Sequence, residues 1–385
     1  MRRNLTQNGP GNGRRAIIHV GTEKTGTTSL QQLLADNREW LRAQGVLFPI
    51  SAGKVNHTRL VAAAEDDGVI DNIKAHIMAA RRETEARLRK TFRADLKQEL
   101  AEGAPWHTLV LSSELIHSRL HTRSEIERLM SFVADAVDSV TIMVVLRRQD
   151  QLAVSRFSTA VRTGHTGFDD VFGDIAEHAY RRLPPSRDIS DMTHYYDYTR
   201  LIDRFSPYVQ DTNFVVRLYE VDGIRMDPVQ LLAEVLDLDP DQLSDNAPSL
   251  NAAMSAEAQY VISQLNQRIP PYLPSGKRNE DVRALKQRIE AELLGPPRNV
   301  PRDAAKTFLA RFDKSNEAVR ARFFPDRTTL FDNDFSMYPQ SVDYSDYPAR
   351  LGPVVNDYVA SLVQMSQPSS ALKRTMVKVR RLWAN

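Results

Sequence analysis

The sequence predicts an α/β protein in which a parallel β-sheet is flanked by helices and followed by a mostly helical C-terminal extension. Two observations lead to this prediction. Over roughly the first 220 residues, short apolar runs that suit buried strands alternate with segments of helical periodicity, an order typical of parallel sheets covered by helices. Beyond that point the recurring patterns are helical and are interrupted by prolines.

The alternating half contains four expected strands, at residues 16–20, 107–111, 140–146 and 213–218. Helical periodicity starts at Thr27, and a stretch rich in Arg, Lys, Glu and Ala predicts one long helix over 69–100 that is exposed on one side. Further helices are expected at 124–136 and, after the third strand, to about residue 163. Segment 45–49 ends in a proline and leads into a loop.

The second half is expected to form helices at 195–205, 228–236, 256–267, 281–294 and 304–323. Its proline clusters break helices and do not mark a flexible linker. We therefore expect one domain over 16–340, with an α/β core to about residue 220 and a helical extension from 221 onward. Residues 1–15 are polar and basic, which predicts a disordered arm, and 341–385 form a C-terminal tail.

The end of that tail, residues 371–383, carries five basic residues and no acidic one, with apolar residues between them. Such a segment suits contact with an anionic membrane, and it suits a solvated terminal helix equally well. On the first interpretation, the protein would be peripheral at the inner face of the membrane.

Composition excludes several kinds of protein. The 385 residues are 42% apolar, enough for one large core or two smaller ones. The chain has no cysteine, so disulfides, thiolate catalysis and zinc–thiolate sites are excluded. No apolar run approaches the length that spans a bilayer and the N-terminus lacks the apolar core of a signal peptide, so a cytoplasmic location is expected. A net charge of +2 gives no support for nucleic-acid binding.

The most informative segment, RAIIHVGTEKTGTTSL at residues 15–30, joins the first expected strand to a helix. Gly21 and Gly26 permit a tight turn and a close approach of backbone to a ligand. Because the helix starts at Thr27, its free N–H groups and the positive end of its dipole point at one spot. An anion is expected there.

The loop differs from the common ATPase loop GxxxxGK[ST], in which a lysine follows the second glycine. Thr27 occupies that position here, and Lys24 lies before the second glycine. A lysine on this limb of the loop is expected near the bridging atom of a phospho-anhydride. The loop then has no lysine where the ATPase loop places one between the β- and γ-phosphates.

A second segment adds another group suited to phosphate. Arg147 directly follows the expected strand at 140–146, and Ser155 lies eight residues later in the following helix. Arginine offers phosphate a planar fork of donors, and a serine hydroxyl adds a short hydrogen bond.

The order Lys24-Thr25-Gly26-Thr27-Thr28 resembles the 5′-phosphosulfate loop of the sulfotransferase family, whose members use 3′-phosphoadenosine 5′-phosphosulfate (PAPS). The resemblance implies a P-loop-like fold, PAPS as co-substrate without a metal, and a clasp on the 3′-phosphate formed by Arg147 and Ser155. Family members more often have Asn-Pro after the arginine, whereas Arg148 and Gln149 follow it here. Arg148 is therefore expected either to offer a second cation or to face solvent.

Segments 216–220 and 323–331 are similar to stretches of bacterial carbohydrate sulfotransferases, so that the resemblance extends over about 16–339. It implies sulfuryl transfer to a hydroxyl or an amine, with a carbohydrate or glycolipid as the expected acceptor. Lys24 would stabilise the departing bridging oxygen. The 5′ side of the ligand would be held by the backbone and hydroxyl groups of Thr22, Thr25, Gly26, Thr27 and Thr28.

Transfer to an acceptor requires a general base, and three residues are candidates. Glu114 ranks first because it follows the strand at 107–111, and ligands bind at the carboxyl ends of such strands. A glutamate favoured by a helix dipole is an equally good interpretation of Glu114. His57 ranks second because histidine titrates in a suitable range. His117, one helical turn past Glu114, either orients it or is solvated.

Two other functions remain open. A P-loop kinase or other phosphotransferase is disfavoured by Thr27 and by a strand that ends in Ser-Ser-Glu, without a magnesium-binding aspartate. A non-catalytic nucleotide-binding module is disfavoured by Lys24. We expect His19 either to pack in the core or to contact the loop. Solvated loop or cap roles are expected for Asp66, Asp67, Asp169 and Asp170. Core packing is expected for Tyr195, Tyr196 and Tyr198, and an aromatic wall for sugar stacking is the alternative.

Overall fold

The computed structural model describes residues 13–103, 105–169, 171–173, 193–244, 253–271, 273 and 279–365. The chain forms two compact units that interleave along the sequence. Unit 1 comprises Met1–Arg156, Ala176–Asn251 and Asp303–Met337. Unit 2 comprises Phe157–Ile175, Ala252–Arg302 and Tyr338–Asn385. The segment 221–340, expected to be one helical extension, is thus shared between them.

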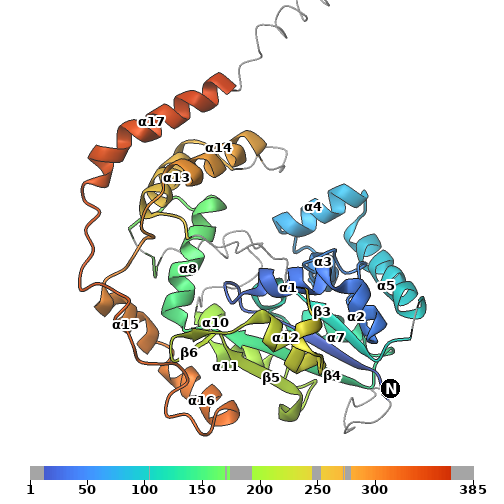
Figure 1. The fold of residues 1–385 in the computed structure, drawn as a ribbon. Coiled ribbons are helices and arrows are strands. Elements are labelled where there is room, and N and C mark those ends of the chain that lie inside the picture. The colour runs from blue at the N-terminus through green and yellow to red at the C-terminus, as the bar shows by residue number, and fades with distance from the viewer. Residues whose placement is uncertain are drawn as a thin grey trace, which may run out of the picture. The chain divides into compact units, whose positions relative to one another are not determined.

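Unit 1 contains a five-stranded sheet in the order β2-β3-β1-β4-β5, with every neighbouring pair parallel (Figure 1). Its strands are β1 (Arg15–His19), β2 (Val46–Leu47), β3 (Thr108–Ser112), β4 (Ser139–Leu146) and β5 (Phe214–Leu218). The predicted α/β class and the four expected strands are confirmed. The edge strand β2 was not expected, and its segment was thought to lead into a loop. A strand of two residues is too short to show a periodicity in the sequence.

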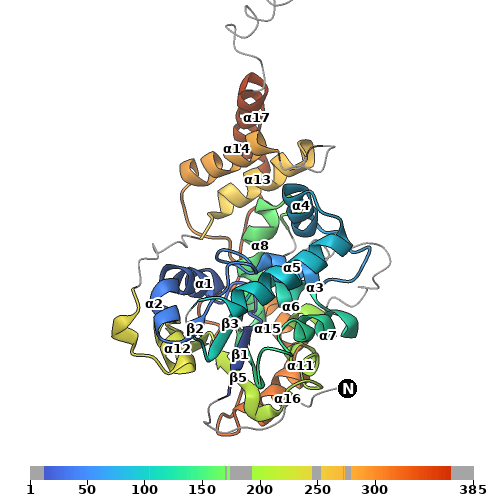
Figure 2. The same ribbon diagram turned by 90° about the vertical axis from the view of Figure 1, so that its right-hand side faces the viewer.

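The three central strands are buried along most of their length because helices cover both faces of the sheet. One face is covered by α1 (Thr27–Asp36), α2 (Arg38–Ala43) and α12 (Pro228–Leu236). Leu30 and Leu231 share a buried cluster there with Ile17 and Val110 of the sheet. Figure 2 shows these helices on one side of the strands and α7 (Arg123–Ser131) and α11 (Tyr198–Asp203) on the other.

The prediction of a single helix over 69–100 is wrong. The structure has two helices there, α4 (Asn72–Arg81) and α5 (Glu85–Ala101). The chain turns at Arg82, which has the left-handed φ of 54°. Thr84 then starts α5 by accepting a hydrogen bond from the N–H of Arg87 through its side chain. Two more helices, α3 (Thr58–Ala64) and α6 (Leu115–Arg119), pack against each other beside them.

Two other expected helices are also divided. The one at 195–205 is split into α10 (Thr193–Tyr196) and α11 by Asp197, whose side chain caps α11. The one at 304–323 is split into α15 (Arg302–Ala310) and α16 (Asp313–Phe323). Short elements that the sequence did not reveal are the hairpin β6 (Glu220–Val221) and β7 (Ile224–Arg225) and the 3-10 turns η1 (Asp211–Asn213) and η2 (Pro240–Gln242).

Unit 2 includes α13 (Ala256–Arg268), α14 (Glu280–Glu292) and α17 (Tyr347–Met365), which pack on one another. The last of these helices was not expected. Near them the guanidinium of Arg298 lies 3.9 Å from the ring centre of Phe168. The basic segment 371–383 and Asp170 lie outside the described residues. Within the described part of the chain, every helix is too short or too polar to cross a membrane.

Candidate functional site

The loop that joins β1 to α1 lies at the carboxyl edge of the sheet, where β3 and β4 also end. Three of its residues have left-handed backbone: Gly21 (φ 77°), Lys24 (φ 65°) and Gly26 (φ 76°). Gly21 also has no room for a side chain, because a Cβ there would lie 2.8 Å from the Cα of Glu114. The loop is therefore packed directly against the residue expected to act as base.

The buried threonines of this loop hold its shape. The hydroxyl of Thr22 donates to the carbonyl of Val145 at 3.1 Å, and the hydroxyl of Thr25 donates to the carbonyl of Thr22 at 2.6 Å. Their hydroxyl protons are thus used within the protein. Thr27 and Thr28 form the first turn of α1, which is preceded by Gly26 without a side-chain cap. The N–H groups of this turn have no partner within the helix and remain suited to an anion.

Arg147 joins the two segments that were expected to bind phosphate. Its Nη1 donates to the carbonyl of Lys24 at 2.8 Å, and its guanidinium lies 4.8 Å from the ring centre of Tyr219. The hydroxyl of Tyr198 donates to the carbonyl of Arg147 and so fixes its backbone. Ser155 lies in α8 (Gln149–Arg162), the helix that begins two residues after Arg147, and is half-buried.

A second arginine contacts the same loop. The Nε of Arg156, in α8 next to Ser155, lies 3.2 Å from the carboxylate of Glu23. Its guanidinium also covers the ring of Tyr195 at 3.7 Å. This ion pair explains how a loop suited to an anion accommodates an acidic residue, because Arg156 offsets the negative charge of Glu23.

Arg148 has neither of its two expected roles. It is buried, its guanidinium forms two hydrogen bonds with Asp150 at 2.8 and 3.0 Å, and it donates to the carbonyls of Asp332 and Asp334. The ring of Phe335 lies 4.4 Å away. Arg148 therefore ties the start of α8 to a segment far along the chain, and it neither faces solvent nor lies free to meet a ligand.

Glu114 lies at the start of α6 with both carboxylate oxygens hydrogen-bonded. Gln31 of α1 donates to Oε2 at 2.8 Å, and Asn56 donates to Oε1 at 2.9 Å. Burial raises the pKa of this carboxyl and the negative charge of Glu23 adds to that effect, whereas the two amide donors act in the opposite direction. A carboxylate with a raised pKa is a stronger base than an exposed glutamate.

The geometry gives His57 a structural role. Its ring is fully buried and stacks on Phe48 at 4.3 Å, and its Nδ1 accepts a hydrogen bond from the backbone N–H of Ser112 at 3.1 Å. Burial and the nearby charge of Arg38 lower the pKa of His57 to about 3. The lone pair that a base would use is thus already engaged.

His117 is neither solvated nor shown to orient Glu114. It is fully buried against the ring of Tyr195 at 4.5 Å, and burial lowers its pKa well below the ordinary value of 6.5. His19 packs beside the loop, as the sequence suggested, with its Nδ1 2.8 Å from the hydroxyl of Ser112. Burial lowers the pKa of His19 to about 4. Tyr195, Tyr196 and Tyr198 are buried, so the expected core packing is observed.

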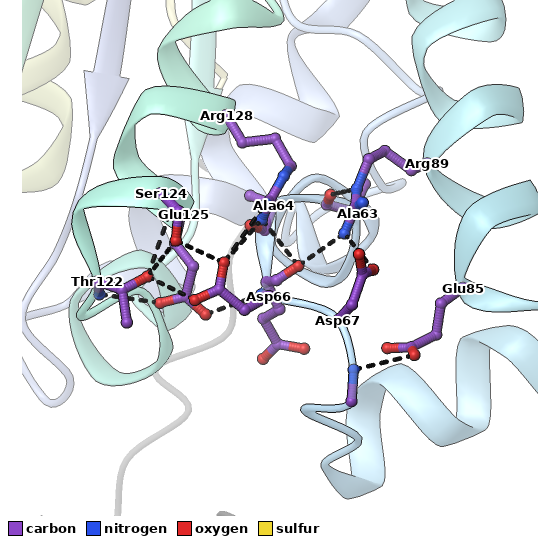
Figure 3. A network of polar contacts seen from close by, with 12 residues as sticks. Ala63, Ala64, Asp66, Asp67, Glu85, Arg89, Thr122, Ser124, Glu125 and Arg128 are labelled. Atoms are coloured by element: carbon purple, nitrogen blue, oxygen red, sulfur yellow. Dashed lines mark hydrogen bonds and ion pairs between the residues drawn. The ribbon is translucent and has the colours of Figure 1, made fainter. Parts of the chain in front are cut away.

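Asp66 and Asp67 lie in the loop after α3 and form hydrogen bonds and ion pairs (Figure 3). Asp66 accepts hydrogen bonds at 2.7 Å from the hydroxyls of Thr122 and Ser124, and Arg128 lies 3.3 Å from it. Asp67 pairs with Arg89 at 3.0 Å. Elsewhere, the backbone carbonyl of Asp169 accepts a hydrogen bond from Arg298. Of the two expected roles, loop or cap, these contacts agree with the loop role, and those of Asp66 and Asp67 link the end of α3 to α5 and α7.

His117 and His121 are four residues apart, a spacing that can place two metal ligands on one helix face. Here α6 ends at Arg119, so His121 lies beyond the helix, and its Nε2 is 3.1 Å from the carbonyl of Ser118. Within the part of the chain that the structure describes, no three His, Asp or Glu side chains gather in a way that could hold a metal ion.

No protein-family model matches the sequence, and no curated protein matches it significantly. Among solved structures, the chain is similar to one described as "Crystal Structure of Sulfotransferase from Alicyclobacillus acidocaldarius". The similarity covers 66% of this chain and 92% of that one, with 16% sequence identity and a TM-score of 0.37. A likeness at this level carries no assignment, so function has to be inferred from the chain's own residues.

Sequence reasoning missed four residues that shape the site: Gln31, Asn56, Arg156 and Tyr219. One local signal was available. Gln31 is a polar residue between the apolar positions Leu30 and Leu33 of α1 and is buried with them. Asn56 contacts Glu114, Arg156 contacts the loop and Tyr219 contacts Arg147, each from a distant segment, and no local pattern marks them.

Proposed function

We propose that this protein is a sulfotransferase, which transfers a sulfuryl group from PAPS to a hydroxyl or amine of a carbohydrate or glycolipid acceptor. The observation that carries the proposal is the hydrogen bond from Arg147 to the carbonyl of Lys24. Through it, the arginine suited to a 3′-phosphate and the lysine suited to a phosphosulfate bridge lie together at the carboxyl edge of the sheet, beside a helix N-terminus.

The proposed reaction is an in-line displacement at sulfur. The acceptor oxygen or nitrogen forms a bond to sulfur while the bond from sulfur to the 5′-phosphate oxygen breaks, and the electron pair of that bond leaves with adenosine 3′,5′-diphosphate. Lys24 offsets the negative charge that grows on the leaving oxygen. The proton of the acceptor passes to the carboxylate of Glu114, which borders the loop at Gly21.

Isothermal titration calorimetry with adenosine 3′,5′-diphosphate and with ADP tests the nucleotide site. We expect the 3′,5′-diphosphate to bind at least about tenfold more tightly, equivalent to about 1.4 kcal/mol, because only it has a 3′-phosphate for Arg147. Arg147→Met should remove this preference. The control is Arg217→Met, since Arg217 of β5 pairs with the exposed Glu234. Equal affinities of the unmodified protein for the two nucleotides would overturn the proposal.

Turnover is tested with sulfur-labelled PAPS and a panel of glycans, glycolipids and small alcohols and amines, with and without magnesium. We expect label transfer that is unaffected by EDTA and strongly reduced in Glu114→Gln. Phosphate transfer from ATP that requires magnesium would indicate a phosphotransferase. Tight binding of adenosine 3′,5′-diphosphate without transfer to any member of the panel would favour a non-catalytic nucleotide-binding module.

Peripheral membrane contact through residues 371–383 is a separate part of the proposal, motivated by their five basic residues. Co-sedimentation with anionic phosphatidylglycerol vesicles should be lost when the chain is truncated at Pro368. Equal sedimentation of the full and truncated chains would remove this part and leave the enzymatic proposal unaffected.

A further inference from the structure

The carboxylate of Glu114 accepts hydrogen bonds from two segments that are distant from it in the sequence. Gln31, on α1, lies 83 residues before Glu114, and Asn56, in the loop before α3, lies 58 residues before it. Each amide donates to a different carboxylate oxygen, at 2.8 and 2.9 Å. The carboxylate plane is therefore fixed by two bonds that do not depend on each other.

Both amides are themselves held in place. Gln31 is only 3% exposed, so its side chain has few alternative positions. Asn56 accepts a hydrogen bond through Oδ1 from the hydroxyl of Ser113 at 2.7 Å, which orients its NH2 group towards Glu114. Gly21 packs against Glu114 from the loop side. Contacts from three segments thus hold the carboxylate of Glu114 in place.

We propose that Gln31 and Asn56 are positioning residues, which hold the Glu114 carboxylate in one orientation beside the phosphosulfate loop and stabilise its ionised form. This inference rests on the proposed function, in which Glu114 accepts the proton of the acceptor. An ionised carboxylate has only acceptor sites, so two N–H donors favour it over the protonated form. Burial alone would favour the protonated form, which cannot accept a proton.

The negative charge of Glu23, in the loop, acts on Glu114 and disfavours its ionisation. Arg156 of α8 pairs with Glu23 at 3.2 Å and reduces that repulsion. Gln31 and Asn56 contribute no net charge, so their effect acts through hydrogen bonds alone. A variant that removes one donor without changing charge therefore isolates the proposed effect.

Gln31→Met is that variant, because methionine keeps the length of the side chain and has no N–H donor. Gln32→Met is the matched control: Gln32 is the next residue of α1, and its amide donates at 2.6 Å to the exposed Asp36. The pKa of Glu114 is measured by NMR titration of protein labelled with 13C at the glutamate carboxyl, with Glu114→Gln to assign the signal. No substrate is needed for this measurement.

We expect Gln31→Met to raise the pKa of Glu114 by about one pH unit and Gln32→Met to leave it unchanged. The acidic limb of the pH profile of kcat/KM should move upward by the same amount, while the affinity for adenosine 3′,5′-diphosphate stays the same. A change in stability without movement of the pKa would indicate packing only and would overturn the inference.

Asn56→Asp provides a second variant if Gln31→Met does not fold. Aspartate can still accept the hydrogen bond from Ser113, but it cannot donate to Glu114 and adds a negative charge, so a larger rise in the pKa of Glu114 is expected. Asn56→Leu removes the same donor without adding charge and should raise this pKa by about one pH unit, which separates the lost hydrogen bond from the added charge. An unchanged pKa of Glu114 would contradict the proposal that Asn56 holds its carboxylate. Because the titration uses the free protein, failure of sulfuryl transfer would count against the proposed function and not against this result.

Discussion

Lys24 has the backbone conformation of a residue held by its surroundings. Its φ of 65° is uncommon for a side chain of this size, and Arg147 donates to its carbonyl. The neighbouring residues are tied as well, since Glu23 pairs with Arg156 and Thr25 donates to Thr22. The direction of the lysine therefore depends on contacts of the loop with β4 and α8.

Lys24→Met tests the role of this ammonium group in the leaving step. We expect kcat for sulfuryl transfer to fall at least about a hundredfold, because charge on the departing oxygen loses its cation, while binding of adenosine 3′,5′-diphosphate weakens far less. Lys54→Met is the control, since Lys54 is exposed in the loop before α3. A kcat within a factor of two of the unmodified protein would exclude the assigned role.

Substitutions at the two loop glycines distinguish the cost of backbone strain from the cost of a steric clash. Gly21→Ala combines a φ of 77° with a Cβ that would lie 2.8 Å from the Cα of Glu114, so we expect a loss of roughly 3 kcal/mol or more. Gly26→Ala has a φ of 76°, but its nearest neighbours would be 3.9 Å away, so a loss of about 1 kcal/mol is expected. Urea unfolding measures both, and equal losses would contradict the contact with Glu114.

At the scale of elements, α3, α5 and α7 are joined by a partly buried polar network (Figure 3). Arg128 donates to the carbonyls of Ala64 and Glu65 at the end of α3, and Thr122 and Glu125 form a capping box at the start of α7. The side chain of Glu65 is buried, and its Oε2 has no hydrogen-bond partner among the residues described. The network therefore contains one poorly stabilised carboxyl.

Glu65 makes stability depend on pH. Burial, together with the nearby Asp71, raises its pKa from 4.5 to about 8. The unfolded chain ionises near pH 4.5, so the stability that protonated Glu65 contributes is complete below that pH and is lost as pH rises to about 8. Glu65→Gln should therefore stabilise the protein by roughly 4 kcal/mol at pH 8 and change little at pH 4.5.

Urea unfolding at the two pH values checks this expectation. Glu127→Gln is the matched control on α7, because Glu127 is exposed and pairs with Arg123 at the surface. It should change stability by less than about 0.5 kcal/mol at both pH values. A stabilisation by Glu65→Gln that is the same at both pH values would show that ionisation of Glu65 is not its cause.

At the scale of the whole molecule, unit 1 depends on contacts between distant segments. The chain leaves unit 1 and returns to it as Asp303–Met337. Arg148 secures this return, since it donates to the carbonyl of Asp332, 184 residues away, while it pairs with the buried Asp150. Gln149 adds a hydrogen bond to Asn316 at 2.6 Å.

Arg148→Met should cost about 3 kcal/mol in the free energy of unfolding, because it leaves the Asp150 carboxylate buried without that guanidinium. It should also make the segment around Asp332 more sensitive to limited proteolysis. Arg327→Met serves as control: Arg327 pairs with the partly exposed Asp332 at 2.8 Å and should cost less than about 1 kcal/mol. Similar losses in the two variants would contradict the structural role of Arg148.

Much of the architecture could be predicted because it follows from local pattern. Apolar runs separated by helical segments require parallel strands, and parallel strands bring their carboxyl ends to one edge. The sequence alone therefore predicts that the loop at Gly21–Thr28 and Arg147 lie at one edge of the sheet. Helix breaks at Arg82 and Asp197 were not predicted, since each depends on a single turn or cap inside an otherwise helical pattern.

The sequence by itself determined the α/β class and the glycine-containing loop between β1 and α1, and it suggested which residues of that loop would meet an anion, because periodicity and loop chemistry are properties of neighbouring residues. Only the tertiary structure decided that His57 and Arg148 are buried and engaged, and that Gln31 and Asn56 hold Glu114. Burial and pairing of this kind arise between segments that meet only when the chain folds, so no local pattern encodes them.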